Sequence, residues 1–420
     1  KLFLACSSVS TDTRNISQNA FFFALKGPNF NANAFAVQAL ESGASYAVID
    51  EVVQPMSDSF ILVDNVLKTL QDLARFHRDY LGLPVVALTG SNGKTTTKEL
   101  INAALQQHFK TIATIGNLNN HIGVPLTLLS MNSDTEVGVI EMGANHATEI
   151  ALLCSLAKPN VGYITNFGKA HLEGFGSEQG IIVAKSELYD YLKANKGLII
   201  MNSDDTKQEK QVGCYSNTFS FSEYKQTSIN IRLLDSQPFL NVSLVDTVIK
   251  THLVGVYNFH NIAAALAIGS YFKLTPQQLK SGIEAYVPAN NRSQIIQQNS
   301  NQILLDAYNA NPSSMGVALE NFKGTQNSNK LAILGDMFEL GATSAKEHLE
   351  IVNQAILTKG CVFYFIGSHF FEQKTNRPKL LFFETYFDLQ KHLEKTSVSN
   401  TSILIKGSRG MALERILEFI

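Results

Sequence analysis

The stretch from Pro84 to Leu100 constrains this chain most, because an apolar strand pattern runs through a glycine-bearing turn into a helix start. Backbone N–H groups of such a turn and of the helix N-terminus can surround anionic oxygens. A lysine at the helix start can reach terminal phosphates, and the threonine after it can bind magnesium. The pattern predicts a nucleoside triphosphate site made of Gly90, Ser91, Asn92, Gly93, Lys94, Thr95 and Thr96.

The loop is shorter than the usual phosphate-binding motif, since Leu88 stands where the first glycine would fall. A Gly-x-x-Gly-Lys-Thr pattern remains, which narrows the class of nucleotide enzyme. A plain turn with a solvated lysine is the alternative. The strand before the loop and the helix after it favour phosphate binding.

Length and composition limit the number of domains, the classes of partner and the compartment. A chain of 420 residues predicts roughly three domains. The formal net charge of −2 gives no reason to expect nucleic acid or an anionic membrane. We expect no signal peptide and no membrane span, and therefore a cytoplasmic protein. Scattered cysteines fit that reducing compartment and are expected to be buried apolar residues rather than nucleophiles: Cys6, Cys154, Cys214 and Cys361.

Residues 84 to about 290 alternate strand and helix patterns, which predicts a mostly parallel sheet covered on both faces. The expected strands are 84–88, 136–141, 161–164, 197–201 and 218–221, followed by a β-hairpin over 229–253 and a helix over 262–271. Ligands of such sheets bind beyond the carboxyl ends of the strands. Glu141, Asn166 and His171 fall at those ends, and the amide-rich segment with Asn119 and Asn120 is expected to join them at the phosphate loop.

The flanking regions also read as α/β. Before the central region, strands are expected at 21–25, 44–49 and 60–63 and helices at 35–42 and 66–80. The turns that carry Ser10 to Arg14 and Lys26 either bind a polar ligand or are plain connections. After a linker at 286–292, strands at 303–306, 330–336, 362–367 and 402–410 predict another α/β domain.

Three side chains extend the predicted phosphate site. Glu141 supplies, with Thr95, the carboxylate and hydroxyl oxygens that magnesium prefers. His171 is a softer ligand; alone it would read as a structural histidine, but it follows a strand end on the same side as Glu141. Lys185 lies on a helix just downstream, and a solvated lysine is its alternative interpretation.

A further domain with polar loops favours an enzyme with a second substrate over a simple nucleotide-dependent switch protein. A phosphoryl group would activate one substrate, and the other domain would bring a second substrate to it. Domain closure would then exclude water from a reactive intermediate. An ATP-dependent ligase fits this organisation, and a nucleotide-binding regulatory protein is the alternative from another class.

The chain resembles the Mur ligases of peptidoglycan synthesis over nearly its whole length. The motifs that carry the likeness are 89–96, 117–123, 141–144, 166–173, 185–187, 202–205, 306–312, 334–341 and 406–409, with Asn258, Asn261 and Arg292. The tract 306–315 points within the family to addition of D-alanyl-D-alanine, since a relative that adds diaminopimelate or lysine would carry an Asp-Asn-Pro-Arg-type sequence. Another Mur-type or folylpolyglutamate-type ligase is the alternative.

The resemblance implies three α/β domains: 1–82 for the UDP-sugar, a central P-loop parallel-sheet ATPase domain at 83–290, and a Rossmann-like domain at 291–420 for the incoming dipeptide. It implies ligation of D-alanyl-D-alanine to UDP-MurNAc-tripeptide through an acyl phosphate, with ATP and two magnesium ions. Whether the third residue of the peptide is diaminopimelate or lysine stays open. We expect a monomer.

The resemblance also assigns roles to residues. Lys94, Glu141, His171 and Lys185 are implied as catalytic, and Thr95 with the last three as metal ligands, Lys185 after carbamylation by carbon dioxide. The neutral amine needed for that adduct should be favoured by partial burial. The nucleotide would also meet Asn258, Asn261, Arg292 and Asp306. The other substrates would meet Ser10, Thr11, Asp12, Arg14, Lys26, Asn119, Asn120, Asn309, Asn311 and Ser313.

Two segments depart from the family pattern. Tyr257 stands where the family often has a histidine, and it could still stack on the adenine. Asn31-Ala32-Asn33 stands where Asp-Gly-His is expected, next to the predicted uridine contacts.

Overall fold

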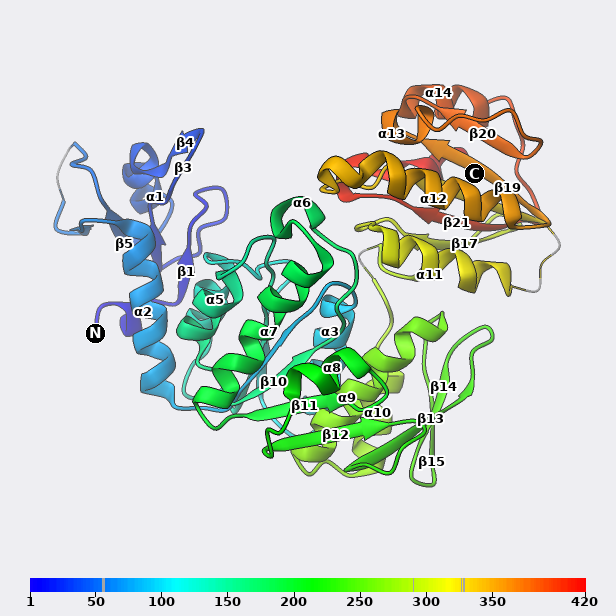
Figure 1. The fold of residues 1–420 in the computed structure, drawn as a ribbon. Helices are drawn as coiled ribbons and strands as arrows, with labels where there is room; N and C mark the ends of the chain where they lie inside the picture. Colours follow the sequence, from blue (N-terminus) through cyan, green and yellow to red (C-terminus); the bar gives the residue numbers. More distant parts are fainter. Residues whose placement is uncertain (55–56, 290, 326, 328) are drawn as a thin grey trace.

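The computed structural model describes residues 1–54, 57–289, 291–325, 327 and 329–420. Asn290, the last residue of the predicted central domain and part of the predicted linker 286–292, lies outside this range. Figure 1 shows three lobes in sequence order, with the N-terminal lobe in blue on one side of the central lobe and the C-terminal lobe in yellow to red on the other. Within the described residues, each lobe contains its own sheet.

The N-terminal lobe has a four-stranded parallel sheet in the order β1-β2-β5-β6. Its elements are β1 (Ser8–Ser10), β2 (Ala20–Phe23), β3 (Lys26–Gly27), β4 (Phe30–Asn31), α1 (Ala36–Glu41), β5 (Ala44–Ile49), β6 (Phe60–Leu62) and α2 (Val66–Leu81). Asn65 caps the start of α2 by accepting from the Lys68 N–H, and Gly82 ends it in a left-handed conformation. The expected strands and helices of this region are present.

The central lobe has a nine-stranded sheet in the order β15-β14-β13-β12-β11-β10-β7-β9-β8 across the described residues. Its strands are β7 (Val85–Thr89), β8 (Thr111–Ala113), β9 (Val137–Glu141), β10 (Val161–Ile164), β11 (Leu198–Asn202), β12 (Thr218–Ser222), β13 (Ile229–Asp235), β14 (Asn241–Leu244) and β15 (Thr247–Lys250). Strands β7 to β12 are parallel, and the expected strands among them are present, whereas β8 was not expected.

The expected hairpin at 229–253 differs from the structure. Three strands form there, and β13 pairs in parallel with β12, so the excursion extends the main sheet. The alternating pattern predicted strands correctly. A hairpin has two strands, whereas the residues after β14 form a third strand, β15, which pairs antiparallel with β14. Local alternation also gives no information about which strand of the sheet is the partner.

Helices cover both faces of the central sheet. They are α3 (Lys94–Leu105), α4 (Gly123–Leu129), α5 (Glu149–Ala157), α6 (Leu172–Phe175), α7 (Glu178–Ala194), α8 (Thr206–Val212), α9 (Phe259–Tyr271) and α10 (Pro276–Ala285). One core packs α3, α9 and α10 on one face of the sheet, and a second packs α4, α5 and α7 on the other and continues onto α2. Burial on both faces explains the nearly continuous apolar runs of β7 and β9.

The C-terminal lobe has a six-stranded sheet in the order β16-β17-β21-β18-β19-β20, antiparallel only at β16 in the described part of the chain. Its elements are β16 (Gln294–Gln298), β17 (Asn301–Asp306), α11 (Pro312–Lys323), β18 (Lys330–Gly335), α12 (Ser344–Leu357), β19 (Cys361–Ile366), α13 (Ser368–Phe371), β20 (Leu380–Phe383), α14 (Tyr386–Leu393) and β21 (Ser402–Lys406). The predicted α/β fold class is confirmed, while β16 and β20 were not expected.

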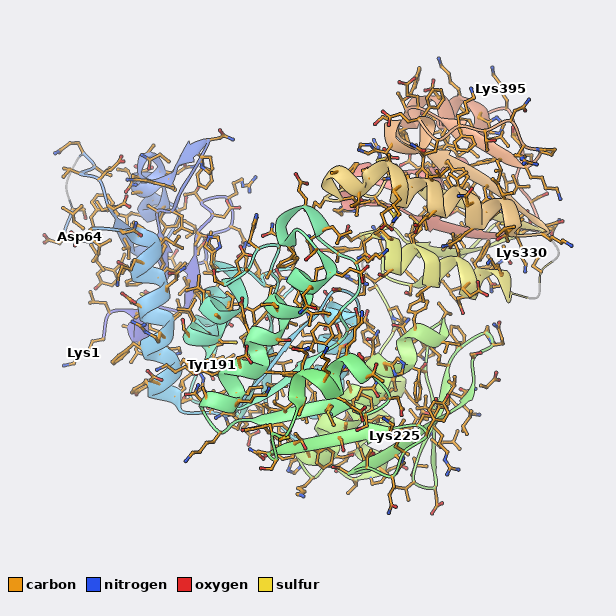
Figure 2. All side chains as sticks on the ribbon, viewed as in Figure 1. Lys1, Asp64, Tyr191, Lys225, Lys330 and Lys395 are labelled. Atoms are coloured by element: carbon orange, nitrogen blue, oxygen red, sulfur yellow. The ribbon has the colours of Figure 1, made fainter. Side chains whose placement is uncertain are left out.

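Side chains fill the space between these layers, and Figure 2 shows Lys225 and Lys395 at the outer surface. No described helix combines the length and the apolar character needed to cross a membrane.

Candidate active site

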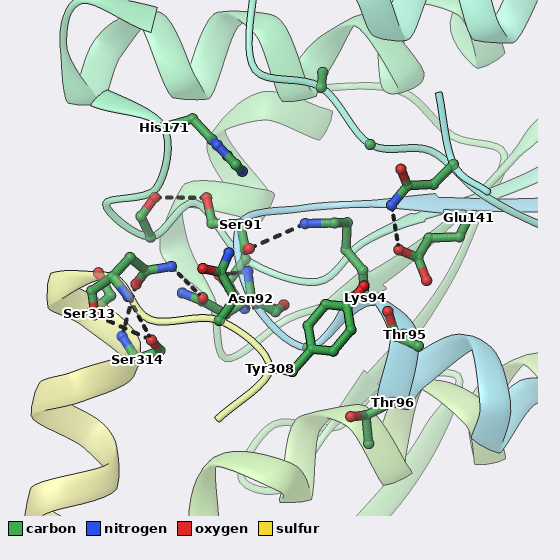
Figure 3. A pocket seen from close by; sticks show the side chains of 18 of the residues that line it. Ser91, Asn92, Lys94, Thr95, Thr96, Glu141, His171, Tyr308, Ser313 and Ser314 are labelled. Carbon is green, nitrogen blue, oxygen red and sulfur yellow. Dashed lines mark hydrogen bonds between the residues drawn. The ribbon is translucent and has the colours of Figure 1, made fainter. Parts of the chain in front are cut away.

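The phosphate-loop segment forms the connection between β7 and α3. Gly90 and Gly93 both have positive φ, +142° and +78°, which side-chain-bearing residues rarely adopt. A Cβ on Gly93 would lie 2.5 Å from the Asn261 Oδ1. Lys94 folds back over the loop and donates to the Gly90 carbonyl at 2.7 Å and to the Ser91 carbonyl at 3.2 Å. Figure 3 shows Lys94 pointing toward Ser91. Burial lowers the pKa of Lys94, an effect that Glu141 opposes. The loop therefore surrounds a space that suits an anion.

A cavity of about 850 Å³ opens at this loop, at the carboxyl ends of the central strands. Both the central and the C-terminal lobes contribute to its walls. The predicted residues that line it are Ser91, Asn92, Gly93, Lys94, Thr95, Thr96, Asn119, Asn120, Glu141, His171, Asn258, Asn261, Arg292, Asp306, Asn309, Asn311 and Ser313.

Glu141 ends β9 inside this cavity, with only 1% of its surface exposed. Its Oε1 accepts from the Asn119 Nδ2 at 2.8 Å. Its Oε2 is buried without a hydrogen-bond partner among the described residues. A buried, half-satisfied carboxylate costs free energy unless a cation or a donor completes it. With the Thr95 hydroxyl in the same cavity, these oxygens fit a hard cation such as magnesium.

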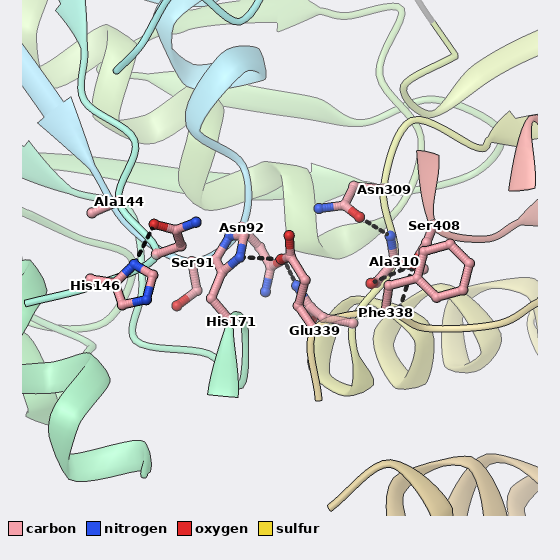
Figure 4. Close-up of polar contacts among 12 residues, drawn as sticks. Ser91, Asn92, Ala144, His146, His171, Asn309, Ala310, Phe338, Glu339 and Ser408 are labelled. Carbon is pink, nitrogen blue, oxygen red and sulfur yellow. Dashed lines mark hydrogen bonds and ion pairs between the residues drawn. The ribbon is translucent and has the colours of Figure 1, made fainter. Parts of the chain in front are cut away.

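His171 lies on the other side of the loop and faces the C-terminal lobe. Its backbone is left-handed at φ +53°, where α6 begins. Its Nδ1 contacts the Glu339 carboxylate, as Figure 4 shows, and this hydrogen bond lowers the pKa of Glu339. Among the described residues, no group of three or more His, Cys, Asp or Glu side chains forms a metal cluster. The role of His171 as a metal ligand thus stays a prediction.

Lys185 lies on α7 and has only 1% of its surface exposed, so it is not a solvated lysine. Its Nζ donates to the Ala144 carbonyl at 2.9 Å and lies 4.9 Å from the centre of the Phe175 ring. Burial, with the Lys94 charge as a smaller cause, lowers the pKa of Lys185 well below its usual value. The neutral amine expected for carbamylation is thereby favoured. Among the described residues, Lys185 does not line the cavity directly.

Asn258 and Asn261 connect the start of α9 to the phosphate-loop helix. Asn261 Nδ2 donates to Asn258 Oδ1 at 2.8 Å, and Asn261 Oδ1 accepts from the Thr97 hydroxyl at 3.0 Å. Asn258 Nδ2 donates to the Val254 carbonyl. Both asparagines are buried at the cavity wall, so they support the loop structurally besides any contact with a base.

The C-terminal lobe brings a charged cluster to the same cavity. The Arg292 guanidinium lies 3.5 Å from the centre of the Tyr308 ring. Asp306, at the end of β17, pairs with the buried Lys406 at the end of β21, at 2.5 Å. Lys406 also donates to the Asn309 carbonyl. Strand-end pairing of this kind holds Asp306 facing the phosphate loop.

Hydrogen bonds join the two lobes at the first turn of α11. Asn311 caps that helix through Ser314, and its Nδ2 donates to the Asn92 Oδ1 at 2.7 Å. The Lys169 N–H donates to the Ser313 hydroxyl at 2.8 Å. Asn311 thus joins the two lobes, and its predicted role in binding the dipeptide stays a prediction.

The predicted residues of the N-terminal lobe do not line this cavity among the described residues. Asp12 and Arg14 pair with each other, and Lys26 pairs with Asp50 and Glu51. Ser10 and Thr11 lie in the same turn as Asp12. In the departing Asn31-Ala32-Asn33 segment, Asn33 is buried and binds Asp50, so the segment is a structural part of the lobe.

Sequence reasoning did not assign a role to Glu339 or Lys169. Lys169 pairs with the buried Glu347 of α12 at 3.1 Å. Glu339 lies in the quoted motif 334–341, which was a signal that it matters, but its partner becomes visible only when two lobes meet.

A phosphate loop at the end of a parallel sheet, facing charged residues of a second α/β lobe, defines a multidomain P-loop nucleotide-binding protein. Residues 88–269 match the Mur ligase middle domain, and residues 291–409 match the Mur ligase, glutamate ligase domain. The chain is 32% identical to the UDP-N-acetylmuramoyl-tripeptide–D-alanyl-D-alanine ligase of Bacillus subtilis, over 98% of this chain and 92% of the relative. It belongs to the Mur ligase family.

Solved structures agree with this assignment. The MurF crystal structure from Acinetobacter baumannii superposes with a TM-score of 0.86 at 29% identity, over 98% of this chain and 92% of that chain. MurF ligase from Thermotoga maritima in complex with ADP also gives 0.86, at 27% identity, over 100% of this chain and 98% of that chain. The three-domain α/β expectation is confirmed at the level of fold.

Proposed function

We propose that this chain is an ATP-dependent, ADP-forming ligase that joins D-alanyl-D-alanine to UDP-MurNAc-tripeptide in peptidoglycan precursor synthesis. The observation that carries the proposal is that the phosphate loop and Glu141 line the same cavity as Arg292 and Asp306 of another lobe. The names of the relatives in Bacillus subtilis and Thermotoga maritima support this substrate set and nucleotide binding.

The reaction has two steps. A carboxylate oxygen of the tripeptide attacks the γ-phosphorus of ATP, the bond to the β-phosphate oxygen breaks, and ADP leaves. The dipeptide amine then attacks the acyl carbon, loses a proton, and displaces inorganic phosphate from the tetrahedral intermediate. Lys94 and the N–H groups of the loop stabilise negative charge on the transferring phosphoryl group.

Metal ligation is part of the proposal. Thr95, Glu141 and His171 would hold magnesium, together with a carbamate on Lys185, which would convert a cation into a carboxylate-like ligand. Bound magnesium would supply charge neutralisation and alignment of the reacting oxygens. The unpartnered Glu141 Oε2 supports such a ligand set.

The remaining assignments complete the proposal. The domain limits are 1–82, 83–290 and 291–420. The N-terminal domain would bind the UDP-sugar near Ser10 to Arg14 and Lys26, and the C-terminal domain would bind the dipeptide near Asn309, Asn311 and Ser313. The protein would act as a cytoplasmic monomer.

The test measures ADP release by the purified chain with each acceptor alone and with both. Turnover that requires D-alanyl-D-alanine and UDP-MurNAc-tripeptide together supports the proposal, and the Lys94→Met variant should abolish it. Lysine- and diaminopimelate-containing tripeptides form separate arms. Turnover with glutamate and a folate acceptor, or ATP hydrolysis independent of any acceptor, would refute the assignment.

A further inference from the structure

The turn that leads into α9 carries a tyrosine that reaches toward the C-terminal lobe. Tyr257 lies in a short 3-10 helix, Val256–Asn258, and its hydroxyl is 2.9 Å from the Ser293 hydroxyl. Gly255, at φ +84°, makes room for the ring, since a Cβ there would lie 2.2 Å from a Tyr257 ring carbon. Burial, with the Asp306 charge as a smaller cause, raises the pKa of Tyr257, so the phenol keeps its proton for this hydrogen bond.

The segment at the Ser293 end of this hydrogen bond has an unusual backbone. Asn291 and Ser293 both have left-handed conformations, at φ +59° and +47°. Residues other than glycine persist there only when their surroundings hold them. The Tyr308 N–H donates to the Asn291 carbonyl at 3.2 Å, and the Ser293 N–H donates to the Asp306 Oδ1 at 3.1 Å. Arg292 lies between these two residues in the chain and lines the cavity.

Tyr257 is the point where two hydrogen-bond networks meet. On the central side, its neighbour Asn258 is bonded to Asn261, which accepts from Thr97 of the phosphate-loop helix. On the C-terminal side, Ser293 is bonded to Asp306, which pairs with Lys406. The Tyr257 hydroxyl therefore joins the two lobes at the residue next to Arg292.

We propose that Tyr257 is a positioning residue: through the Ser293 hydroxyl it fixes the linker backbone so that Arg292 and Asp306 face the nucleotide. This inference rests on the proposed nucleotide site. Tyr257 need not touch the nucleotide for this role, because it acts through Ser293. The hydroxyl, rather than the ring, is the group that carries it.

Tyr257→Phe tests the hydroxyl alone. Leaving Ser293 without its partner should weaken ADP binding, measured by calorimetry, about tenfold, and should raise the KM for ATP by a similar factor while kcat changes less. Tyr271→Phe is the matched control, because Tyr271 ends α9, the helix that follows Tyr257, is exposed, and its hydroxyl makes no hydrogen bond to the described residues. ADP affinity should be unchanged in that variant.

Ser293→Ala removes the other half of the same hydrogen bond. It should weaken ADP binding to the same extent as Tyr257→Phe, and the double variant should be no worse than either single variant. Thermal unfolding is measured for the parent and for all four variants. A variant that unfolds at lower temperature but binds ADP as tightly as the parent would show a merely structural role and overturn the proposal.

The outcomes separate this inference from the proposed function. If Tyr257→Phe does not fold, Ser293→Ala decides, and unchanged ADP affinity there overturns the inference. If the parent chain binds no ADP at all, the proposed nucleotide site fails, and the inference fails with it. If the parent binds ADP and catalyses ligation but both variants match it, only the inference is refuted.

Discussion

Replacing Lys185 by methionine should stabilise the folded protein while abolishing ligation. Lys185 is almost fully buried, and burial lowers the pKa of its ammonium well below the usual value. Lysine in the unfolded chain has a pKa near 10.4. Keeping Lys185 neutral in the folded protein therefore costs about 1.4 kcal/mol for each unit by which the pH lies below 10.4. At pH 9 that cost is about 2 kcal/mol, and at pH 8 it is about 3 kcal/mol, as long as the folded pKa lies below the pH.

The opposing effect is smaller. Methionine has a similar volume but leaves the Ala144 carbonyl without the donor that now lies 2.9 Å away. One lost hydrogen bond of this kind costs about 1 kcal/mol. Wherever the pH lies between the lowered pKa of folded Lys185 and 10.4, the gain from removing the buried amine is about 1.4 kcal/mol for each unit below 10.4, so the variant should be more stable than the parent once the pH is more than about one unit below 10.4.

The sign of the pH dependence follows from proton counting. Between the lowered pKa of folded Lys185 and about 10.4, the unfolded parent binds one proton that the folded parent does not, so the stability of the parent rises with pH in that range. The variant has no such group, and its advantage should shrink by about 1.4 kcal/mol per pH unit. Urea unfolding in buffers free of carbon dioxide, from pH 7.5 to 9.5, measures this difference without interference from carbamylation.

Lys193→Met is the matched control, because Lys193 lies on the same helix and also donates to a carbonyl, that of Gln211, but is only partly buried. Its variant should show no stabilisation and no such slope. A Lys185→Met protein that is less stable than the parent, or a difference that does not vary with pH, would refute a neutral buried Lys185. Retained ligase activity in that variant would refute the carbamate proposal.

Two further perturbations address the loop and the C-terminal lobe. Gly93→Ala should abolish measurable ADP binding in calorimetry, because φ +78° strains alanine by about 1 kcal/mol or more and the new Cβ would meet Asn261 Oδ1 at 2.5 Å; ordinary affinity would contradict the loop geometry. Buried His348 accepts from the Met337 N–H and contacts the Ser344 carbonyl, and burial lowers the pKa of its imidazole. Below about pH 6.5 the unfolded chain therefore binds a proton that the folded chain does not, so the stability of the folded protein should fall as the pH drops. Thermal unfolding from pH 8 to 5 should show a shallower acid slope in His348→Gln, and identical slopes would contradict this origin.

Much of the fold followed from local sequence patterns. The strand-turn-helix of the phosphate loop was predictable because glycines, apolar alternation and helix-start residues act over a few residues. The end of β9 at Glu141 was predictable for the same reason. The edge strands β16 and β20 were missed, since edge strands have weaker apolar patterns and depend on a neighbouring strand.

The site divides in the same way. The sequence by itself determined which residue types gather at the carboxyl ends of the strands, because the parallel sheet places those ends together. Only the tertiary structure decided what each side chain contacts: Asn311 donates a hydrogen bond to Asn92, and His171 contacts the Glu339 carboxylate. The burial of Lys185 is likewise a tertiary property, since a helix pattern does not specify what packs over a lysine. Contacts between residues more than a hundred positions apart depend on how whole lobes pack, and short-range pattern carries no record of them.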